Sequence, residues 1–206
     1  MSARLDRPDK GLAVIRALFM LIVLWPMAAW AEPVTLKPGE ILRGHFVQER
    51  FLAGFAQPLR SEGSFVLAPG QGLIWRGEKP FAVVTVISAA GMTQSLGGKE
   101  TMRLSAAKAP FLARLHDVMA GAMAGNWQEL ESDFRVVSQN DGVVLTPRRA
   151  DLLQSVKSIQ AHIGRFVDAV EVEKGEGDRD RLLFSQQNVD QGPLSEDEAA
   201  AFAAIR

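Results

Sequence analysis

Glycine and proline recur at short intervals after residue 31, and this spacing constrains the fold more than any other feature of the sequence. The segments between them are about five to ten residues long and rich in β-branched and aromatic side chains, which is typical of antiparallel strands. The pattern predicts about eleven strands. They are expected at 45–52, 59–67, 72–77, 81–88, 92–96, 101–105, 127–138, 143–146, 155–163, 166–173 and 181–188.

Tight turns connect these strands to their sequence neighbours. Asn140-Asp141-Gly142, Gly164-Arg165 and the segment 175–178 each lie between two strand-like segments, and Asp-Gly is a strong hairpin signal. Short connections favour a meander. A sheet of about eleven strands is too strongly twisted to stay flat. We therefore expect a mainly β fold with some α-helix, in which the antiparallel sheet curls toward a barrel and encloses a concave face.

The stretch GSFVLAPGQGLIW, residues 63–75, is apolar on both faces of its two strands. A strand that is covered on one face only should alternate apolar with polar residues. We therefore expect one face of this hairpin to pack in a core and the other to line a pocket.

Residues 108–125 break the β pattern, because their apolar side chains are spaced by three and four. Pro110 suits a first helical turn and Gly125 a stop, so the segment predicts an amphipathic helix that could cover the concave face. Periodicity alone favours a core role for such a stripe over a ligand-binding role. A second, structural helix is predicted after the capping-box pair Ser195 and Glu198.

The first 31 residues are typical of an export signal. Arg4, Arg7, Lys10 and Arg16 precede the run ALFMLIVLW, which is too short to span a bilayer, and AWA offers a cleavage point after Ala31. A retained membrane anchor is the less favoured alternative. We expect a periplasmic protein with one domain over 32–206.

Composition excludes several classes of protein. The formal net charge is −1, without the surplus of basic residues that nucleic-acid binding would need. There is no cysteine, which excludes a disulfide scaffold, a thiol nucleophile and attachment to lipid through an N-terminal Cys.

Motifs of catalysis and metal binding are missing from the sequence. There is no G-x-S-x-G, P-loop or H-E-x-x-H pattern, and His45, His116 and His162 are far apart. Acidic residues crowd the hairpin 171–181 and alternate with Lys and Arg, which favours a solvated turn over a cation site. We expect no enzyme activity, no cofactor and no bound metal.

Several blocks resemble, in their order, the periplasmic LolA family of outer-membrane lipoprotein carriers. They are Phe46-Val47-Gln48, EGSFVLAPGQGLIW, PFLARL, DGVVLTPRR and FSQQNV, and they cover most of the chain after residue 31. The resemblance implies an incomplete β-barrel with an α-helical lid, whose cavity shields the acyl chains of a lipoprotein. It also implies an inner-membrane transporter as donor and an outer-membrane receptor as acceptor.

Two departures from the family pattern suggest a divergent branch. Ala68 stands before Pro69 where family members tend to place a basic residue, and the opening helix is reduced to 36–42, broken by Pro38 and Gly39. The cargo is therefore expected to be an acylated lipoprotein or another lipid-like molecule, carried by a monomer.

The expected cargo lining combines strand residues with the apolar side of the helix 108–125. It consists of Phe46, Phe65, Leu67, Leu73, Trp75, Val84, Val86, Met102, Leu104, Phe111, Leu112, Leu115, Met119 and Met123. Trp75 and Trp127 could instead be structural aromatics, and the sequence does not say which pleat face of 63–75 points inward.

Two functions from different classes remain open. The first is a carrier that delivers lipid-like cargo toward the outer membrane. The second is a sensing module of the same fold that binds lipid or lipoprotein and signals to a protein partner. A hydrolase is a weaker third hypothesis.

Overall fold

The computed structural model describes residues 34–108, 121, 127–149, 153 and 156–205. All described residues lie in one compact unit, which spans Glu32–Arg206. The predicted export signal lies outside the described residues. Of the predicted helix 108–125, only Lys108 and Gly121 are described, and Gly121 is helical and buried.

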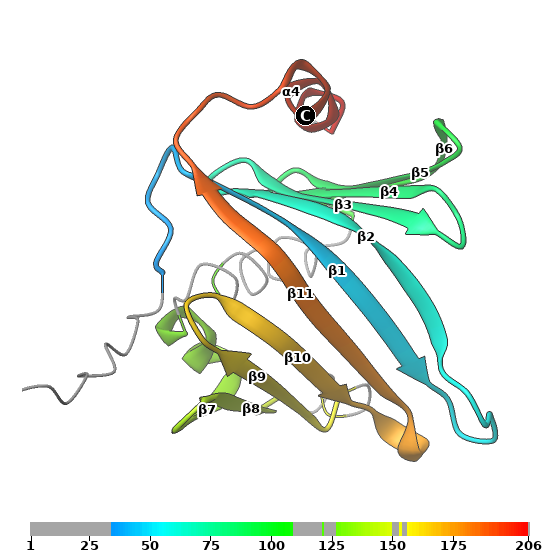
Figure 1. Cartoon of the computed structure of the whole chain (residues 1–206), viewed down its shortest axis with the longest axis vertical. Coiled ribbons are helices and arrows are strands. Elements are labelled where there is room, and N and C mark those ends of the chain that lie inside the picture. The colour runs from blue at the N-terminus through cyan, green and yellow to red at the C-terminus, as the bar shows by residue number, and fades with distance from the viewer. Residues whose placement is uncertain (1–33, 109–120, 122–126, 150–152, 154–155, 206) are drawn as a thin grey trace, which may run out of the picture. The chain divides into compact units, whose positions relative to one another are not determined.

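Eleven strands form one antiparallel sheet, as predicted (Figure 1). They are β1 Ile41–Phe51, β2 Leu59–Ala68, β3 Gly72–Lys79, β4 Val83–Ser88, β5 Gly91–Leu96, β6 Lys99–Ser105, β7 Phe134–Gln139, β8 Gly142–Pro147, β9 Ser158–Ile163, β10 Val167–Glu173 and β11 Arg179–Asp190. Helix α4 spans Glu196–Ala203, and short 3-10 helices span Gln128–Ser132 and Gly175–Gly177.

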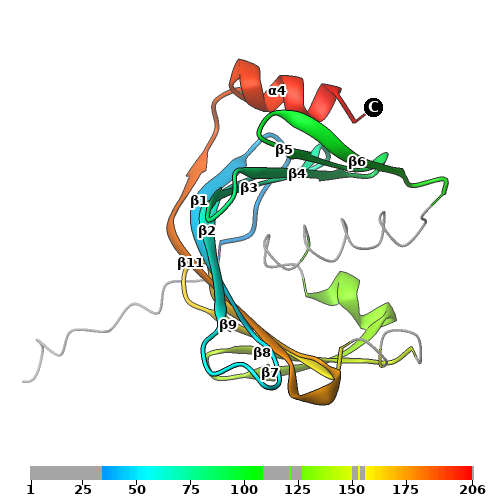
Figure 2. The ribbon, with the colours of Figure 1, turned by 90° about the vertical axis from the view of Figure 1, so that its right-hand side faces the viewer.

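The strand order is β6-β5-β4-β3-β2-β1-β11-β10-β9-β8-β7. This corrects the expectation of a single meander. Two meanders, β1 to β6 and β7 to β11, are joined where the first strand pairs with the last, from Ile41 opposite Asp190 to Phe51 opposite Arg179. Within this sheet β6 and β7 each have one neighbouring strand, so the barrel is unclosed, and Figure 2 shows the sheet curving between these two edges.

The segment before β1 differs from the expected short helix. Pro38 and Gly39 form a turn, in which Gly39 has a φ of +88° and the backbone N–H of Glu40 donates to the carbonyl of Lys37. A proline and a left-handed glycine are incompatible with a helix interior. The chain therefore enters β1 directly at Ile41, four residues before the predicted start.

The strand that follows the predicted helix 108–125 also starts later than expected. The sequence predicted a strand over 127–138, but this segment begins with the 3-10 helix Gln128–Ser132, and β7 starts at Phe134. Leu130 in this helix is buried against Phe134, so the segment packs as a helical turn under the strand that follows.

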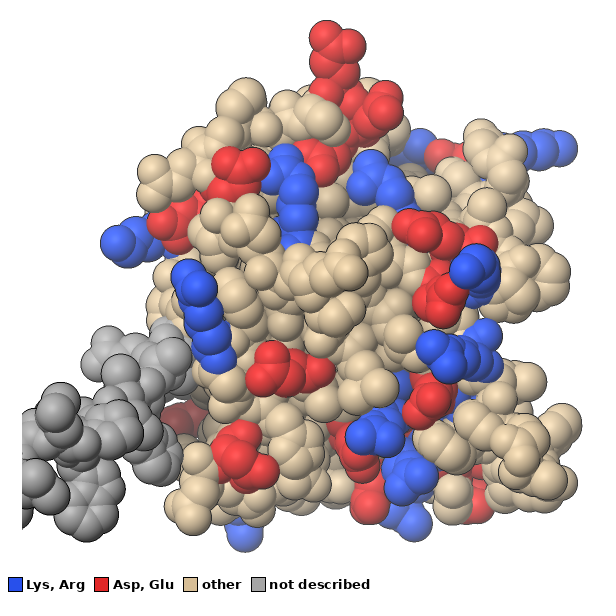
Figure 3. All heavy atoms as spheres, viewed as in Figure 1, with Lys and Arg blue, Asp and Glu red and all other residues tan. Residues whose placement is uncertain are grey.

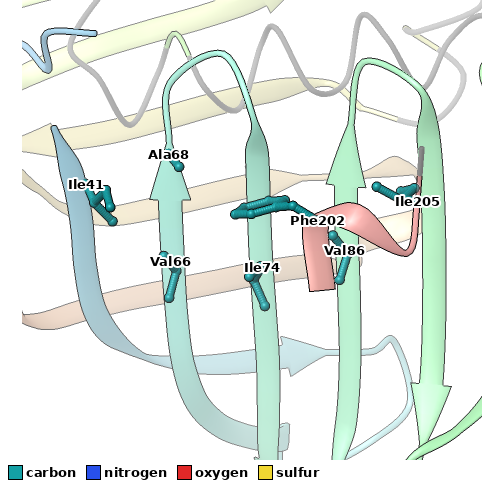
Figure 4. Packing of buried hydrophobic residues seen from close by; sticks show 7 residues of the cluster. All are labelled: Ile41, Val66, Ala68, Ile74, Val86, Phe202 and Ile205. Atoms are coloured by element: carbon teal, nitrogen blue, oxygen red, sulfur yellow. The ribbon is translucent and has the colours of Figure 1, made fainter. Parts of the chain in front are cut away.

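Helix α4 covers the outer, convex face of the sheet (Figure 2). Phe202 and Ile205 pack there with Ile74, which is fully buried, and with Val86 (Figure 4). Gly72 permits close packing on both sides: it has a φ of +146°, and a Cβ on it would lie 3.1 Å from the Phe202 ring of α4 and 2.1 Å from the carbonyl oxygen of Ile87 in β4. The outer side of the hairpin 63–75 is therefore core, as expected.

A buried carboxylate fixes the start of α4. Ser195 and Glu198 form the predicted capping box, with the Glu198 carboxylate accepting from the Ser195 backbone N–H at 2.9 Å. The same carboxylate accepts two hydrogen bonds from Arg43 on β1, at 3.0 and 2.7 Å. The Arg43 hydrogen bond lowers the pKa of Glu198, and the pairing raises that of Arg43.

Candidate functional site

The face of the sheet opposite α4, here called the inner face, is apolar where β1, β2 and β3 meet. The register places Leu42 beside Leu67 and Leu67 beside Leu73. These three side chains form a buried cluster with Phe65 and Leu36. Gly44 makes room for this packing, because a Cβ on it would lie 2.7 Å from the Phe65 ring.

Four aromatic rings occupy the middle of the inner face. Phe46 stacks on Trp75 with ring centroids 3.8 Å apart. Phe184 of β11 meets Phe65 edge-on at 5.5 Å and Trp75 at 6.2 Å. Phe46 and Phe184 are paired residues on β1 and β11, so this aromatic group spans the junction of the two meanders.

A second apolar cluster covers the inner face of β7 to β10. Its buried members are Leu130, Phe134, Val143, Leu145, Ala161 and Val167. Phe184 packs against this cluster as well as against the first one. The inner face is therefore apolar without interruption from β3 to β8. The outer face differs, since Lys and Arg are interspersed with Asp and Glu over the side seen in Figure 3.

A pocket of about 280 Å³ lies at one end of the inner face, beyond the aromatic group. Phe46 and Trp75 border it, and four polar side chains line it: Gln48, Ser61, Thr85 and Gln94. The Gln94 side-chain amide donates to the Thr85 hydroxyl at 3.3 Å. The rest of the lining comes from β3, from the β3–β4 connection and from the start of β4: Gly77, Lys79, Pro80, Phe81 and Val83. The hollow therefore has both apolar and polar walls.

The structure brings most of the predicted strand residues to the inner face. Phe46, Phe65, Leu67, Leu73 and Trp75 lie together there. Met102 and Leu104 share the same face, because Met102 pairs with Gln94, which pairs with Thr85, which pairs with Trp75. Residues Phe111, Leu112, Leu115, Met119 and Met123 lie outside the described residues.

Val84 and Val86 are corrections to the predicted lining. Val86 pairs with Ile74, and both side chains pack under α4 on the outer face; Val84 packs against the same cluster. The inner positions of β4 are Thr85 and Ile87, which pair with Trp75 and Leu73. Each observed inner residue is the sequence neighbour of a predicted one, and neighbouring residues of a strand point to opposite faces of the sheet.

The sequence prediction also missed residues of the inner face. Leu36 and Leu42 belong to the first cluster, and Phe184 joins the two clusters. Alternation along β1 placed Leu42 on the same side as Phe46, and this signal was present in the sequence. Nothing local could identify Phe184, because its position depends on the pairing of the first strand with the last.

Two acidic residues of the predicted solvated hairpin, Asp180 and Glu171, are engaged in ion pairs. The Asp180 carboxylate lies 3.1 Å from Arg50 and 2.6 Å from Lys174, and Glu171 lies 3.3 Å from Arg181. Within the described part of the chain, no group of three or more His, Asp or Glu residues could hold a metal ion. No helix there has the length and apolarity needed to cross a membrane.

The family model described as "Outer membrane lipoprotein carrier protein LolA-like" matches residues 34–204. None of the curated proteins compared with the chain matches it.

Solved structures that resemble the chain include the following three. A LolA superfamily protein from Nitrosomonas europaea is 11% identical, with a TM-score of 0.42, over 81% of this chain and 92% of that one. A DUF1329 family protein from Desulfovibrio piger is 12% identical, with a TM-score of 0.43, over 81% and 91%. A chain of the MucA/MucB complex from Pseudomonas aeruginosa is 16% identical, with a TM-score of 0.36, over 78% and 55%.

Proposed function

Because this chain belongs to the family of LolA-like outer membrane lipoprotein carrier proteins, we propose that it carries a lipoprotein or another lipid-like cargo with the acyl chains held against the inner face. The match confirms the family resemblance of the sequence blocks. In this proposal residues 1–31 direct export to the periplasm. There the protein, as a monomer, takes cargo from an inner-membrane transporter and delivers it to an outer-membrane receptor.

The observation that supports the proposal most strongly is the uninterrupted apolar inner face. Both apolar clusters lie on it, and Phe184 connects them across the junction of β1 and β11. Both meanders therefore present apolar side chains to the same side of the sheet. Phe111, Leu112, Leu115, Met119 and Met123 would complete the lining, and the two methionines would adapt it to chains of different shape.

The energetic requirement is the transfer of hydrocarbon out of water. Each buried methylene contributes about 0.8 kcal/mol, so one sixteen-carbon chain represents on the order of 12 kcal/mol of gross transfer free energy. A surface that left half of the chain in water would forfeit about half of this value. Release requires no chemical step, only an acceptor that binds the cargo more tightly.

Native mass spectrometry of the full chain, expressed in a Gram-negative host and isolated from the periplasm, tests this proposal. We expect a mass shift from co-purifying acylated material, identified by extraction and fragmentation. A protein that reaches the periplasm and carries no acylated molecule would contradict the proposal.

A charge on the inner face should abolish retention of the cargo. Val170 packs against the second cluster from β10 and is partly exposed, so Val170→Glu would place a carboxylate against acyl chains without creating a cavity. We expect at least a tenfold loss of co-purified lipid. Ala169→Glu is the matched control, because Ala169 is the adjacent residue of the same strand, points to the other face and is also partly exposed. Equal retention in both variants would refute the assigned face.

Transfer of the cargo separates a carrier from a sensor. Loaded protein mixed with acceptor vesicles should lose its cargo to them. A sensor should instead keep its ligand and bind a protein partner more tightly when loaded.

A further inference from the structure

Exposed apolar side chains gather at one end of the sheet. Among the described residues six large apolar side chains are exposed, and all except Val137 of β7 lie at this end, on strand ends or on connections. We call these five residues the apolar rim; they are Phe55, Leu59, Phe81, Leu96 and Leu153. Single exposed apolar residues are ordinary on a protein surface, but a group of them at one place marks an interaction surface.

The strand pairing brings these residues to a common end. The last residue of β3 pairs near the start of β2, so the β3–β4 connection with Phe81 lies on the same side as the β1–β2 connection. Leu96 at the end of β5 pairs with Val83. The β8–β9 connection with Leu153 reaches this end through the pairings of β9, β10 and β11 with β1. The arrows of β1 and β3 end on the right-hand side of Figure 1, and Figure 2 views the molecule from that side.

Cations are the outermost charges beside the rim residues of the first meander. The Arg60 guanidinium and the Lys79 ammonium lie 3.6 and 2.7 Å from one carboxylate, that of Glu62. The two cationic side chains are 60% and 77% exposed, whereas that of Glu62 is 34% exposed. Lys99 is exposed as well and pairs with Leu96 across the β5–β6 turn. The positive charges therefore extend further into the solvent than the carboxylate that two of them share.

The rim has no large surplus of charge, because Glu49, Glu78 and Glu100 lie on the same strand ends. Its attraction for a partner must therefore come mainly from the apolar residues. Apolar side chains on separate connections, with Lys and Arg between them, suit the boundary between lipid headgroups and acyl chains, where the apolar groups enter and the cations stay at the level of the phosphates.

The pocket of about 280 Å³ at the end of the inner face opens at this rim. Phe81 and Lys79 line it, and so do Phe46 and Trp75 of the aromatic group. A second hollow of about 450 Å³ shares Lys79 with it and is bordered by Arg60. A hydrocarbon tail can therefore pass from the inner face to whatever the rim contacts. If that is a bilayer, the tail never enters water, whereas a protein partner would have to supply an apolar path of its own.

We propose that the apolar rim docks the protein on the surface of a phospholipid bilayer. Phe55, Phe81 and Leu96 enter the boundary between headgroups and acyl chains, and Arg60 and Lys79 pair with lipid phosphates. This inference goes beyond the proposed function, because it assigns a surface that meets a membrane and not the cargo, and it holds for an empty carrier as well as for a loaded one.

Cosedimentation with vesicles of phosphatidylethanolamine and phosphatidylglycerol tests the docking surface. The protein is isolated from the periplasm, and all variants are made in the same chain, so that differences between them report on the rim. We expect the wild type to sediment with the vesicles. The double variant Phe55→Ser with Leu96→Ser should bind them about tenfold more weakly or less, because two apolar side chains no longer enter the bilayer.

The cargo provides a second readout for the same variant. Neither Phe55 nor Leu96 lines the two hollows at the rim, so the double variant should retain as much co-purified cargo as the wild type. Val137→Ser is the matched control, because Val137 is 47% exposed but lies within the edge strand β7. We expect it to change neither vesicle binding nor cargo.

Three results would overturn the docking role. A wild type that does not sediment with the vesicles would leave the rim to a protein partner. Equal binding by the double variant and by Val137→Ser would show that the rim is not the contact. Loss of the cargo in the double variant would place its residues in the cargo lining. The carrier function is judged separately, since a protein that binds vesicles and carries no acylated molecule would support docking and contradict the carrier.

Discussion

The carboxylate of Glu198 accepts hydrogen bonds from the Arg43 guanidinium and from the Ser195 backbone N–H while only 6% of the residue is exposed. In Glu198→Gln the charge of Arg43 would lose this partner. We expect the free energy of unfolding in urea at pH 7 to fall by about 2 kcal/mol. Glu196→Gln, at an exposed position of the same helical turn, should change it little. Equal losses in the two variants would contradict the role given to Glu198.

Gly70 in the β2–β3 turn and Gly72 at the start of β3 should respond differently to alanine. Both have positive φ, +146° and +78°, but only a Cβ on Gly72 would meet other atoms, the carbonyl of Ile87 and the ring of Phe202. We expect Gly70→Ala to cost about 1 kcal/mol of unfolding free energy from backbone strain alone. Gly72→Ala should cost about 3 kcal/mol or more. Thermal unfolding followed by circular dichroism measures both, and similar values would show that Ile87 and Phe202 do not restrict the space around Gly72.

Residue types and spacing predicted the positions of the strands better than they predicted which face of the sheet each side chain occupies. Eleven short segments between turn residues were sufficient to identify eleven strands. The inner or outer orientation of a side chain depends on a single residue of register, and this is why Val84 and Val86 were assigned to the wrong side. Met102 and Leu104 reach the expected face through three successive strand pairings.

The attachment of helix α4 to the sheet should weaken in acid. The pKa of Glu198 is lowered, chiefly by its hydrogen bond with Arg43. A carboxyl group whose pKa is lower in the folded than in the unfolded state stabilises the fold above the unfolded value. This contribution disappears as the pH falls through the folded value. The difference in unfolding free energy between the wild type and Glu198→Gln should therefore be largest near pH 7 and shrink below about pH 4. Urea unfolding at several pH values measures it, and a difference that grew in acid would contradict this linkage.

At the scale of the whole molecule, the sequence predicted an unclosed barrel with a two-sided hairpin, and both are present. Strands that are joined by a short turn pair with each other, so the strand pairing within each meander could be predicted from the local sequence. The pairing of β1 with β11 was not, because the two strands lie at opposite ends of the described chain and no local signal links them. Phe184, which unites the inner face, was missed for the same reason.

The place of β11 in the sheet also sets an order of events during folding. A chain that emerges amino end first can complete the β1 to β6 meander before its last strand is available. Until then the backbone groups along one side of β1 have no strand partner. Contacts of such long sequence separation form late in folding. The two apolar clusters of the inner face therefore unite only when the final strand has joined β1, and a chain that lacks this strand has two separate apolar surfaces in place of one.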